Sequence, residues 1–188
     1  MSNNSNIETC GLIIGAFKPF TKGHHFLFEV AAIENDHVLV SVSQKDRKRK
    51  GEHPIEWEKM KIVWDEYIVG KLPKNITVIS AESPIQGLYN FLKMNDDKPE
   101  GANVVFTLYM DDKDLKRYCY QDHELKNKFP NLYNRNQIKV KTFNRESNVN
   151  VSATKMRKTL QDNDLQGFTE CLPDVLKDQA SEIFTLLS

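Results

Sequence analysis

The alternation of short apolar runs with longer amphipathic stretches constrains the fold of this chain more than any other feature of its sequence. The apolar, β-branched runs predict strands at residues 10–15, 37–42, 76–80, 103–109 and 137–143. Between them, apolar residues recur at helical spacing over residues 22–35, 56–69 and 85–94. Strands that alternate with helices in this way form a parallel sheet with helices on both faces. We therefore expect an α/β fold.

Two further segments follow different patterns. Residues 152–188 predict a C-terminal tail of two or three short helices, interrupted near Gly167 and Pro173. Residues 112–136 are charged with interspersed aromatic side chains, and two interpretations stay open for them: a helix with a loop, or a lid. No repeat or flexible linker divides the chain. We therefore expect a single domain over residues 1–188, with a core at about 9–160 and C-terminal helices at about 161–188.

The composition excludes several classes of protein. Lys and Arg total 26, and Asp and Glu also total 26. This zero net charge argues against a dedicated nucleic-acid-binding protein, in which a basic excess supplies most of the affinity. No apolar run reaches the ~20 residues of a membrane span, and the polar N-terminus does not resemble a signal peptide. The three cysteines are far apart and form no Cys-x-x-Cys pair, so we expect no protein-bound metal and a cytoplasmic location.

The loop after the first predicted strand has the pattern of a phosphate site. Gly15 ends the strand, and Thr21 is a suitable N-cap for the helix that follows. Gly23 and His24 then fall in the first helical turn, where free N–H groups and the helix dipole attract anions. Lys18, or the lysine at position 22, adds positive charge. The alternative is an ordinary capped helix with its histidines on the surface.

A second helix start, just after the fifth predicted strand, has similar properties. Ser152 is a suitable N-cap, and the hydroxyl of Thr154 and the free N–H groups of the first turn are available to phosphate oxygens. Arg157 lies one turn further on, and its side chain leans back toward the helix start. The alternative is a capped helix with Arg157 in a surface salt bridge.

Two weaker candidates follow other predicted strands. A basic run after the second strand contains Lys45, Lys48 and Lys50, and we interpret it either as a solvated loop or as a loop that closes over an acidic ligand. Asp111 follows the fourth strand, where a carboxylate can contact a ribose or magnesium, although an ordinary loop carboxylate is an equal alternative.

The two helix starts together resemble the paired signatures of the nucleotidyltransferase superfamily, Gly-x-Phe-x-Pro-x-His/Thr-x-Gly-His and Ile-Ser-Ser/Ala-Thr-x-x-Arg. This superfamily includes nicotinamide-mononucleotide adenylyltransferases, phosphopantetheine adenylyltransferases and cytidylyltransferases. The matching residues are Gly15, Phe17, Pro19, Thr21, Gly23, His24, Ser152, Ala153, Thr154 and Arg157. Two positions differ: Thr21 replaces the first histidine, as in the phosphopantetheine branch, and Ala16 replaces an arginine that is frequent in the nicotinamide-mononucleotide enzymes. The C-terminal tail resembles that of phage-encoded members.

The resemblance implies a Rossmann-like sheet of five parallel strands in the order 3-2-1-4-5, with a C-terminal helical tail. It also implies transfer of a nucleoside monophosphate, most simply AMP from ATP, to a phosphate-bearing acceptor such as nicotinamide mononucleotide, with release of pyrophosphate. Mg²⁺ would come with the triphosphate. The catalytic residues would be His24, Lys18 and Arg157. The nucleotide-binding residues would be Gly15, Ala16, Phe17, Thr21, Gly23, His24, Asp111, Ser152, Thr154 and Arg157, with Lys45, Lys48 and Lys50 closing over phosphate.

Several alternatives stay open at this level. The resemblance also fits a cytidylyltransferase or a phosphopantetheine-type adenylyltransferase, and a non-catalytic nucleotide sensor is the alternative from another class. We expect ATP or another triphosphate and a phosphorylated small molecule as partners, and neither nucleic acid nor membrane. A homo-oligomer is left open, and a phage-encoded protein would act in the host cytoplasm.

Overall fold

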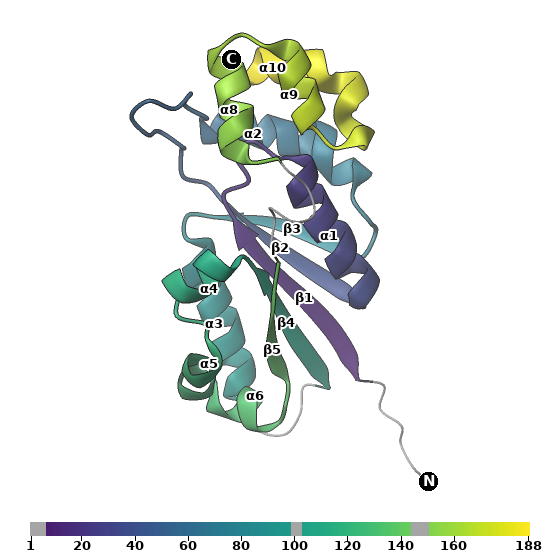
Figure 1. Cartoon of the computed structure of the whole chain (residues 1–188). Coiled ribbons are helices and arrows are strands. Elements are labelled where there is room, and N and C mark those ends of the chain that lie inside the picture. Colours follow the sequence, from purple (N-terminus) through teal and green to yellow (C-terminus); the bar gives the residue numbers. More distant parts are fainter. Residues whose placement is uncertain (1–6, 99–102, 144–150) are drawn as a thin grey trace.

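Five parallel strands form one sheet in the computed structural model, which describes residues 7–98, 103–143 and 151–188 (Figure 1). The strands are β1 (Glu8–Gly15), β2 (His37–Ser43), β3 (Ile76–Ala81), β4 (Val104–Met110) and β5 (Ile138–Thr142). Their order is β3-β2-β1-β4-β5, as expected. β1 is central: its Leu12 is paired with Leu39 of β2 and with Leu108 of β4. The strand order reverses beside β1, and in such sheets ligands bind at the carboxyl ends of the strands next to this point.

Helices cover both faces of the sheet (Figure 1). They are α1 (Lys22–Glu34), α2 (Trp57–Ile62) continued by η1 (Val63–Ile68) and η2 (Val69–Lys71), α3 (Pro84–Asp96), α4 (Asp112–Arg117), α5 (Asp122–Lys128), α6 (Pro130–Asn134), α8 (Ala153–Gln161), α9 (Leu165–Cys171), η3 (Asp174–Gln179) and α10 (Ala180–Leu187). Neighbouring residues of β1 point to opposite faces, so Ile13 joins one buried cluster and Leu12 the other. The first cluster holds α1, α2 with η1, and the C-terminal helices against the sheet.

Residues 112–136, for which two interpretations were open, form three short helices. α5 and α6 pack on the second cluster through Leu125, Phe129 and Leu132, all of them buried. Such burial makes this part of the segment a structural layer of the fold rather than a lid. The beginning of the segment, α4, directly follows β4 at the carboxyl edge of the sheet.

The predicted helix over residues 56–69 is not α-helical throughout. Its second half, η1, is a π-helix, and η2 ends it as a 3₁₀ turn. In an α-helix, four residues make slightly more than one turn, whereas in the wider π-helix they make slightly less than one turn. Side chains four residues apart are therefore displaced in opposite directions around the axis in the two helix types. The change of helix type therefore keeps Met60, Trp64 and Ile68 on one buried face, with at most 2% of each residue exposed.

Two other details differ from the predictions. Phe26, Leu27, Val30 and Ala31 recur at helical spacing in the sequence, which predicts that they form the core stripe of this helix. The core face of α1 is instead formed by His24, Leu27, Phe28 and Ala31, and Phe26 and Val30 are only half-buried. In the tail, the first break lies before α9 and not at Gly167. Asp164 caps α9 by accepting a hydrogen bond from the Gly167 N–H group at 2.9 Å. A Cβ atom at position 167 would lie 2.2 Å from that carboxylate, so glycine here serves the cap rather than a break.

Candidate functional site

The start of α1 is held by a reciprocal pair of hydrogen bonds between Thr21 and His24. The His24 N–H group donates to Oγ1 of Thr21 at 3.3 Å, and the Thr21 N–H group donates to Nδ1 of His24 at 3.1 Å. This arrangement is a capping box in which histidine takes the place that glutamate or glutamine usually fills. It confirms Thr21 as the N-cap, and it fixes the orientation of the imidazole.

The same contact decides which nitrogen of the neutral His24 ring carries the proton. Nδ1 accepts a hydrogen bond from a backbone N–H group, so the proton of the neutral ring is on Nε2. The ring is also held by aromatic neighbours: its centroid lies 5.0 Å from that of Phe17, in an edge-to-face arrangement, and 5.9 Å from that of Phe20. His24 is 5% exposed, which makes it a buried, oriented hydrogen-bond donor rather than a surface residue.

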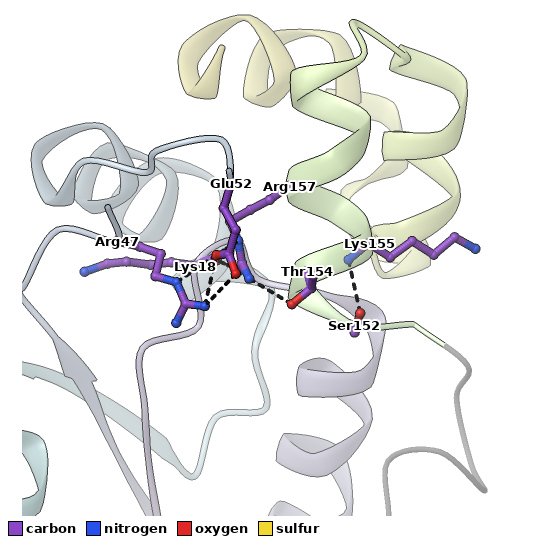
Figure 2. A network of polar contacts seen from close by, with 7 residues as sticks. All are labelled: Lys18, Arg47, Glu52, Ser152, Thr154, Lys155 and Arg157. Carbon is purple, nitrogen blue, oxygen red and sulfur yellow. Dashed lines mark hydrogen bonds and ion pairs between the residues drawn. The ribbon is translucent and has the colours of Figure 1, made fainter. Parts of the chain in front are cut away.

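The start of α8 is built in the way that the sequence predicts. Oγ of Ser152 accepts a hydrogen bond from the Lys155 N–H group at 3.1 Å, and Nη2 of Arg157 donates to Oγ1 of Thr154 at 2.9 Å (Figure 2). Arg157 therefore reaches back along its own helix toward the N-terminus. It is 3% exposed, which excludes an ordinary surface salt bridge.

Arg157 also joins the two predicted segments directly. Its Nη1 donates to the backbone carbonyl of Lys18 at 2.7 Å, across 139 residues of sequence. Its Nε lies 3.0 Å from Oε2 of Glu52, in an ion pair. Burial lowers the pKa of Arg157, the nearby charge of Arg47 lowers it further, and Glu52 opposes both effects. The guanidinium is thus fixed on several sides at the junction of the two motifs.

Lys18 is placed differently from the other predicted residues. Its Nζ donates to the carbonyl of Ser43 at 2.6 Å and to the carbonyl of Lys45, and it lies 5.0 Å from the centroid of the Trp57 ring. Burial lowers the pKa of Lys18 to about 8, although the charge of Asp46 acts in the opposite sense. The side chain therefore ties the first loop to the end of β2.

One cavity of about 1050 Å³ lies at the carboxyl edge of the sheet and is bordered by both motifs. It is lined by most of the predicted residues, namely Gly15, Ala16, Phe17, Lys18, Thr21, His24, Lys45, Lys48, Asp111, Ser152, Thr154 and Arg157. Gly23 and Lys50 are not among the lining residues. Eight Lys or Arg residues and four Asp or Glu residues line it, so this cavity is locally basic although the whole chain has no net charge. Such a site favours a polyanionic ligand.

Gly23 lies beside the other motif and is not among the residues that line the cavity. A Cβ atom built at this position would lie 3.5 Å from the carbonyl oxygen of Val151, which is an ordinary contact distance. The packing of the described residues therefore does not by itself require glycine here.

The basic run is partly engaged in ion pairs. Nζ of Lys48 lies 2.9 Å from Asp46 and 3.6 Å from Glu56. Arg47, which we did not single out in the sequence, forms hydrogen bonds with Glu52 and lines the cavity. Its position in a basic run after a strand was an available signal, whereas nothing in the sequence marked Glu52 as its partner.

We did not identify from the sequence the residues that form another wall of the cavity. This wall is formed by residues 82–85 at the start of α3, by Asp114 and Arg117 of α4, and by Tyr118 directly after α4. The Ser83-Pro84 pair, a common helix start, follows β3 at the carboxyl edge and was a usable signal. No motif in the sequence marked the side chains of α4 as part of this wall.

Two kinds of feature are absent from the residues that the structure describes. No group of three or more His, Cys, Asp or Glu residues in this part of the chain could hold a metal ion. None of its helices combines the length and the apolar character needed to cross a membrane.

The comparisons with known proteins agree with this architecture. Residues 10–83, fewer than half of the chain, match the family described as citrate lyase ligase C-terminal domain. No curated protein sequence matches the chain.

Solved structures resemble almost the whole chain. A Vibrio parahaemolyticus protein, provisionally assigned as a nicotinate-nucleotide adenylyltransferase, is 16% identical with a TM-score of 0.58, over 93% of this chain and 99% of its own. A Plasmodium falciparum nicotinic acid mononucleotide adenylyltransferase complexed with NaAD is 14% identical with a TM-score of 0.52, over 95% of this chain and 97% of its own. A bifunctional NMN adenylyltransferase/ADP ribose pyrophosphatase from Francisella tularensis is 15% identical with a TM-score of 0.60. The match covers 96% of this chain and about half, 52%, of that protein.

These findings define the fold: the chain has the Rossmann-like α/β fold of these adenylyltransferase structures. The resemblance drawn from the two motifs is confirmed at this level. At these identities the likeness shows the fold alone, and it gives no support to a phage origin.

Proposed function

We propose that this protein is a nucleotidyltransferase that transfers AMP from ATP to a phosphate-bearing small molecule and releases pyrophosphate. The observation that carries the proposal is the convergence of two helix starts on one basic cavity, one with His24 and the other with Arg157. A single capped helix would be unremarkable in any α/β protein. Two that share a cavity at the reversal of strand order supply donors to a ligand with several phosphate groups.

The proposed reaction is an in-line displacement at phosphorus. An oxygen of the acceptor phosphate forms a bond to the α-phosphorus of ATP, and the bond between that phosphorus and the bridging oxygen to the β-phosphate breaks. The electron pair leaves with pyrophosphate. The acceptor is already ionised at neutral pH, so the protein needs no general base, and catalysis rests on alignment and on neutralising charge.

The residues at the two helix starts take different roles in this proposal. His24 donates from Nε2 to the α- or β-phosphate, and the backbone of residues 15–17 contributes N–H groups. Thr21 holds the imidazole, because its hydroxyl and its N–H group are both within hydrogen-bond distance of Nδ1. Ser152 and Thr154 begin the helix that faces the β- and γ-phosphates, and Arg157 supplies charge there.

Lys18 is the least direct of the proposed catalytic residues. Its ammonium is bound by two carbonyl groups, so we assign it to the joint between the first loop and the basic run, with an electrostatic effect on the acceptor. Mg²⁺ enters as part of the triphosphate substrate, and we assign Asp111, one of the four carboxylates that line the cavity, to face it or the ribose.

Nicotinamide mononucleotide is the acceptor that we propose first, in line with the names of the structural relatives. The wall formed by residues 82–85 and by α4 leaves room beside the phosphate-binding groups, and Tyr118 there is an aromatic surface for a ring. A phosphopantetheine, sugar or alcohol phosphate is the alternative, and CTP is the alternative nucleotide.

The proposal is tested by combining ATP, CTP, GTP and UTP with a panel of phosphorylated acceptors, in the presence of Mg²⁺, and measuring pyrophosphate release. We expect release with ATP and one class of acceptor, and its loss in Arg157→Ala. If folded protein binds ATP but releases no pyrophosphate with any combination of nucleotide and acceptor, the result would instead indicate a nucleotide sensor. Failure to bind any triphosphate would refute both readings.

A further inference from the structure

Glu52 lies outside both sequence motifs, yet its carboxylate joins two arginines at the cavity (Figure 2). Nε and Nη2 of Arg47 donate to Oε2 of Glu52 at 3.1 and 3.0 Å. Nε of Arg157 lies 3.0 Å from the same oxygen. One carboxylate oxygen thus faces two guanidinium groups that come from segments more than 100 residues apart.

The arrangement has an electrostatic reason. Two guanidinium groups this close repel each other, and Arg157 is too deeply buried for water to screen its charge. Burial by itself would raise the pKa of Glu52, but Arg47 and Arg157 outweigh that effect and hold the pKa below its usual range. Glu52 is therefore a carboxylate anion that compensates both charges.

The carboxylate holds the two arginines from outside the cavity. Arg47 and Arg157 are among the residues that line the cavity, and Glu52 is not. A guanidinium has five N–H groups. The hydrogen bonds and ion pairs among the described residues engage Nε and Nη2 of Arg47, with Nη2 contacting both carboxylate oxygens of Glu52. In Arg157 they engage Nε and one N–H group on each Nη. Within the described part of the chain, the Nη1 N–H groups of Arg47 and one N–H group on each Nη of Arg157 take part in none of these contacts.

We propose that Glu52 is a positioning residue that fixes Arg47 and Arg157 as a paired clamp for the terminal phosphates of the triphosphate. This inference rests on the proposed function of the site. It assigns Arg47 a role in phosphate binding, and it explains the loop that carries Glu52 as the element that places this carboxylate beside the two arginines. The antiparallel bridge between Arg47 and Ile55 supports that loop, because it returns the chain past Arg47 and so brings Glu52 within reach. The opposite reading is that Glu52 is an internal anion that the triphosphate must displace.

The two readings predict opposite signs for triphosphate affinity. We expect Glu52→Ala to raise the Kd of Mg-ATP by about tenfold, the lower end of what the loss of an orienting partner costs in metal sites. Glu52→Gln should lose less, because its amide oxygen still accepts one hydrogen bond. Magnesium tripolyphosphate should show the same order, since the clamp contacts phosphate only, and the KM of the acceptor should not change. A displaced anion would instead give tighter binding in both variants.

Isothermal titration calorimetry of each variant with Mg-ATP and with magnesium tripolyphosphate measures these affinities, and thermal unfolding checks the fold. Glu170→Gln, which removes an exposed carboxylate on α9, is the matched control and should bind like the wild type. In the Arg47→Ala background, Glu52→Ala should reduce the affinity less than in the wild type, because one of the two arginines that Glu52 positions is already absent. Unchanged or tighter binding by folded Glu52→Ala, or equal losses in the two backgrounds, would overturn the inference alone. If neither the wild type nor Glu170→Gln binds Mg-ATP, the proposed function fails, and the inference fails with it.

Discussion

The His24→Asn substitution separates the two tasks that the structure gives to one imidazole. An asparagine carbonyl oxygen lies close to the place of Nδ1, so it can accept the hydrogen bond from the Thr21 N–H group and keep the capping box. It has no group at the place of Nε2, and the donor to phosphate is lost. His24→Gln is the complementary variant, because its longer side chain brings an amide N–H group near the position of Nε2.

The expected loss follows from the geometry of a buried, oriented donor. Removing one such donor from a developing negative charge lowers turnover by roughly 10²–10³-fold, or about 2.7–4 kcal/mol of transition-state stabilisation. The stability loss should be smaller, about 1–2 kcal/mol, since it comes from weaker packing against Phe17 and Phe20 while the cap is kept.

The assay is pyrophosphate release at saturating ATP and acceptor, with thermal unfolding of each variant measured in the same buffer. We expect turnover to rank wild type, then His24→Gln, then His24→Asn. Near wild-type turnover in folded His24→Asn would show that Nε2 does not act on the transferred phosphate, and the role of His24 would then be limited to capping α1.

Three further predictions test other parts of the site. Gly23→Ala should keep or slightly raise the Tm, because a Cβ atom there meets Val151 at an ordinary distance and alanine favours a helix; a rise in the KM for ATP would then show close approach of the ligand, and an unchanged KM would refute it. Arg157→Ala should mainly raise the KM for the triphosphate, and unchanged kinetics would remove this residue from the site. The pKa of Lys18 is lowered to about 8, so above that pH the folded state binds fewer protons than the unfolded state. The stability of the wild type relative to Lys18→Met should therefore increase from about pH 8 toward the ordinary lysine pKa, as urea unfolding at several pH values would show; a flat difference would refute the burial of the ammonium.

The sequence by itself determined the layers of the fold and both helix starts. Strand and helix periodicity depends on local alternation of apolar residues, and a cap depends on residues three positions apart, so Thr21 and Ser152 were identified without tertiary information. Two predicted features of the helices were wrong because the observed local structure depends on tertiary packing. The π-helical turn of η1 follows from the need to bury Trp64 and Ile68 together, and the cap by Asp164 moved the tail break away from Gly167.

Only the tertiary structure decided how the charged residues are used. Charge on a side chain is visible in the sequence, but its partner depends on which loops meet at the sheet edge. We predicted Lys18 as a catalytic residue and Lys48 as part of a loop over an acidic ligand. Both line the cavity, as Arg47 does, but Nζ of Lys18 binds backbone carbonyl groups and Lys48 pairs with Asp46. The contact between Arg157 and the Lys18 carbonyl spans 139 residues, and no local pattern encodes it. Long-range ion pairs of this kind form because burial makes an unpaired charge costly, and that cost exists only once the chain has folded.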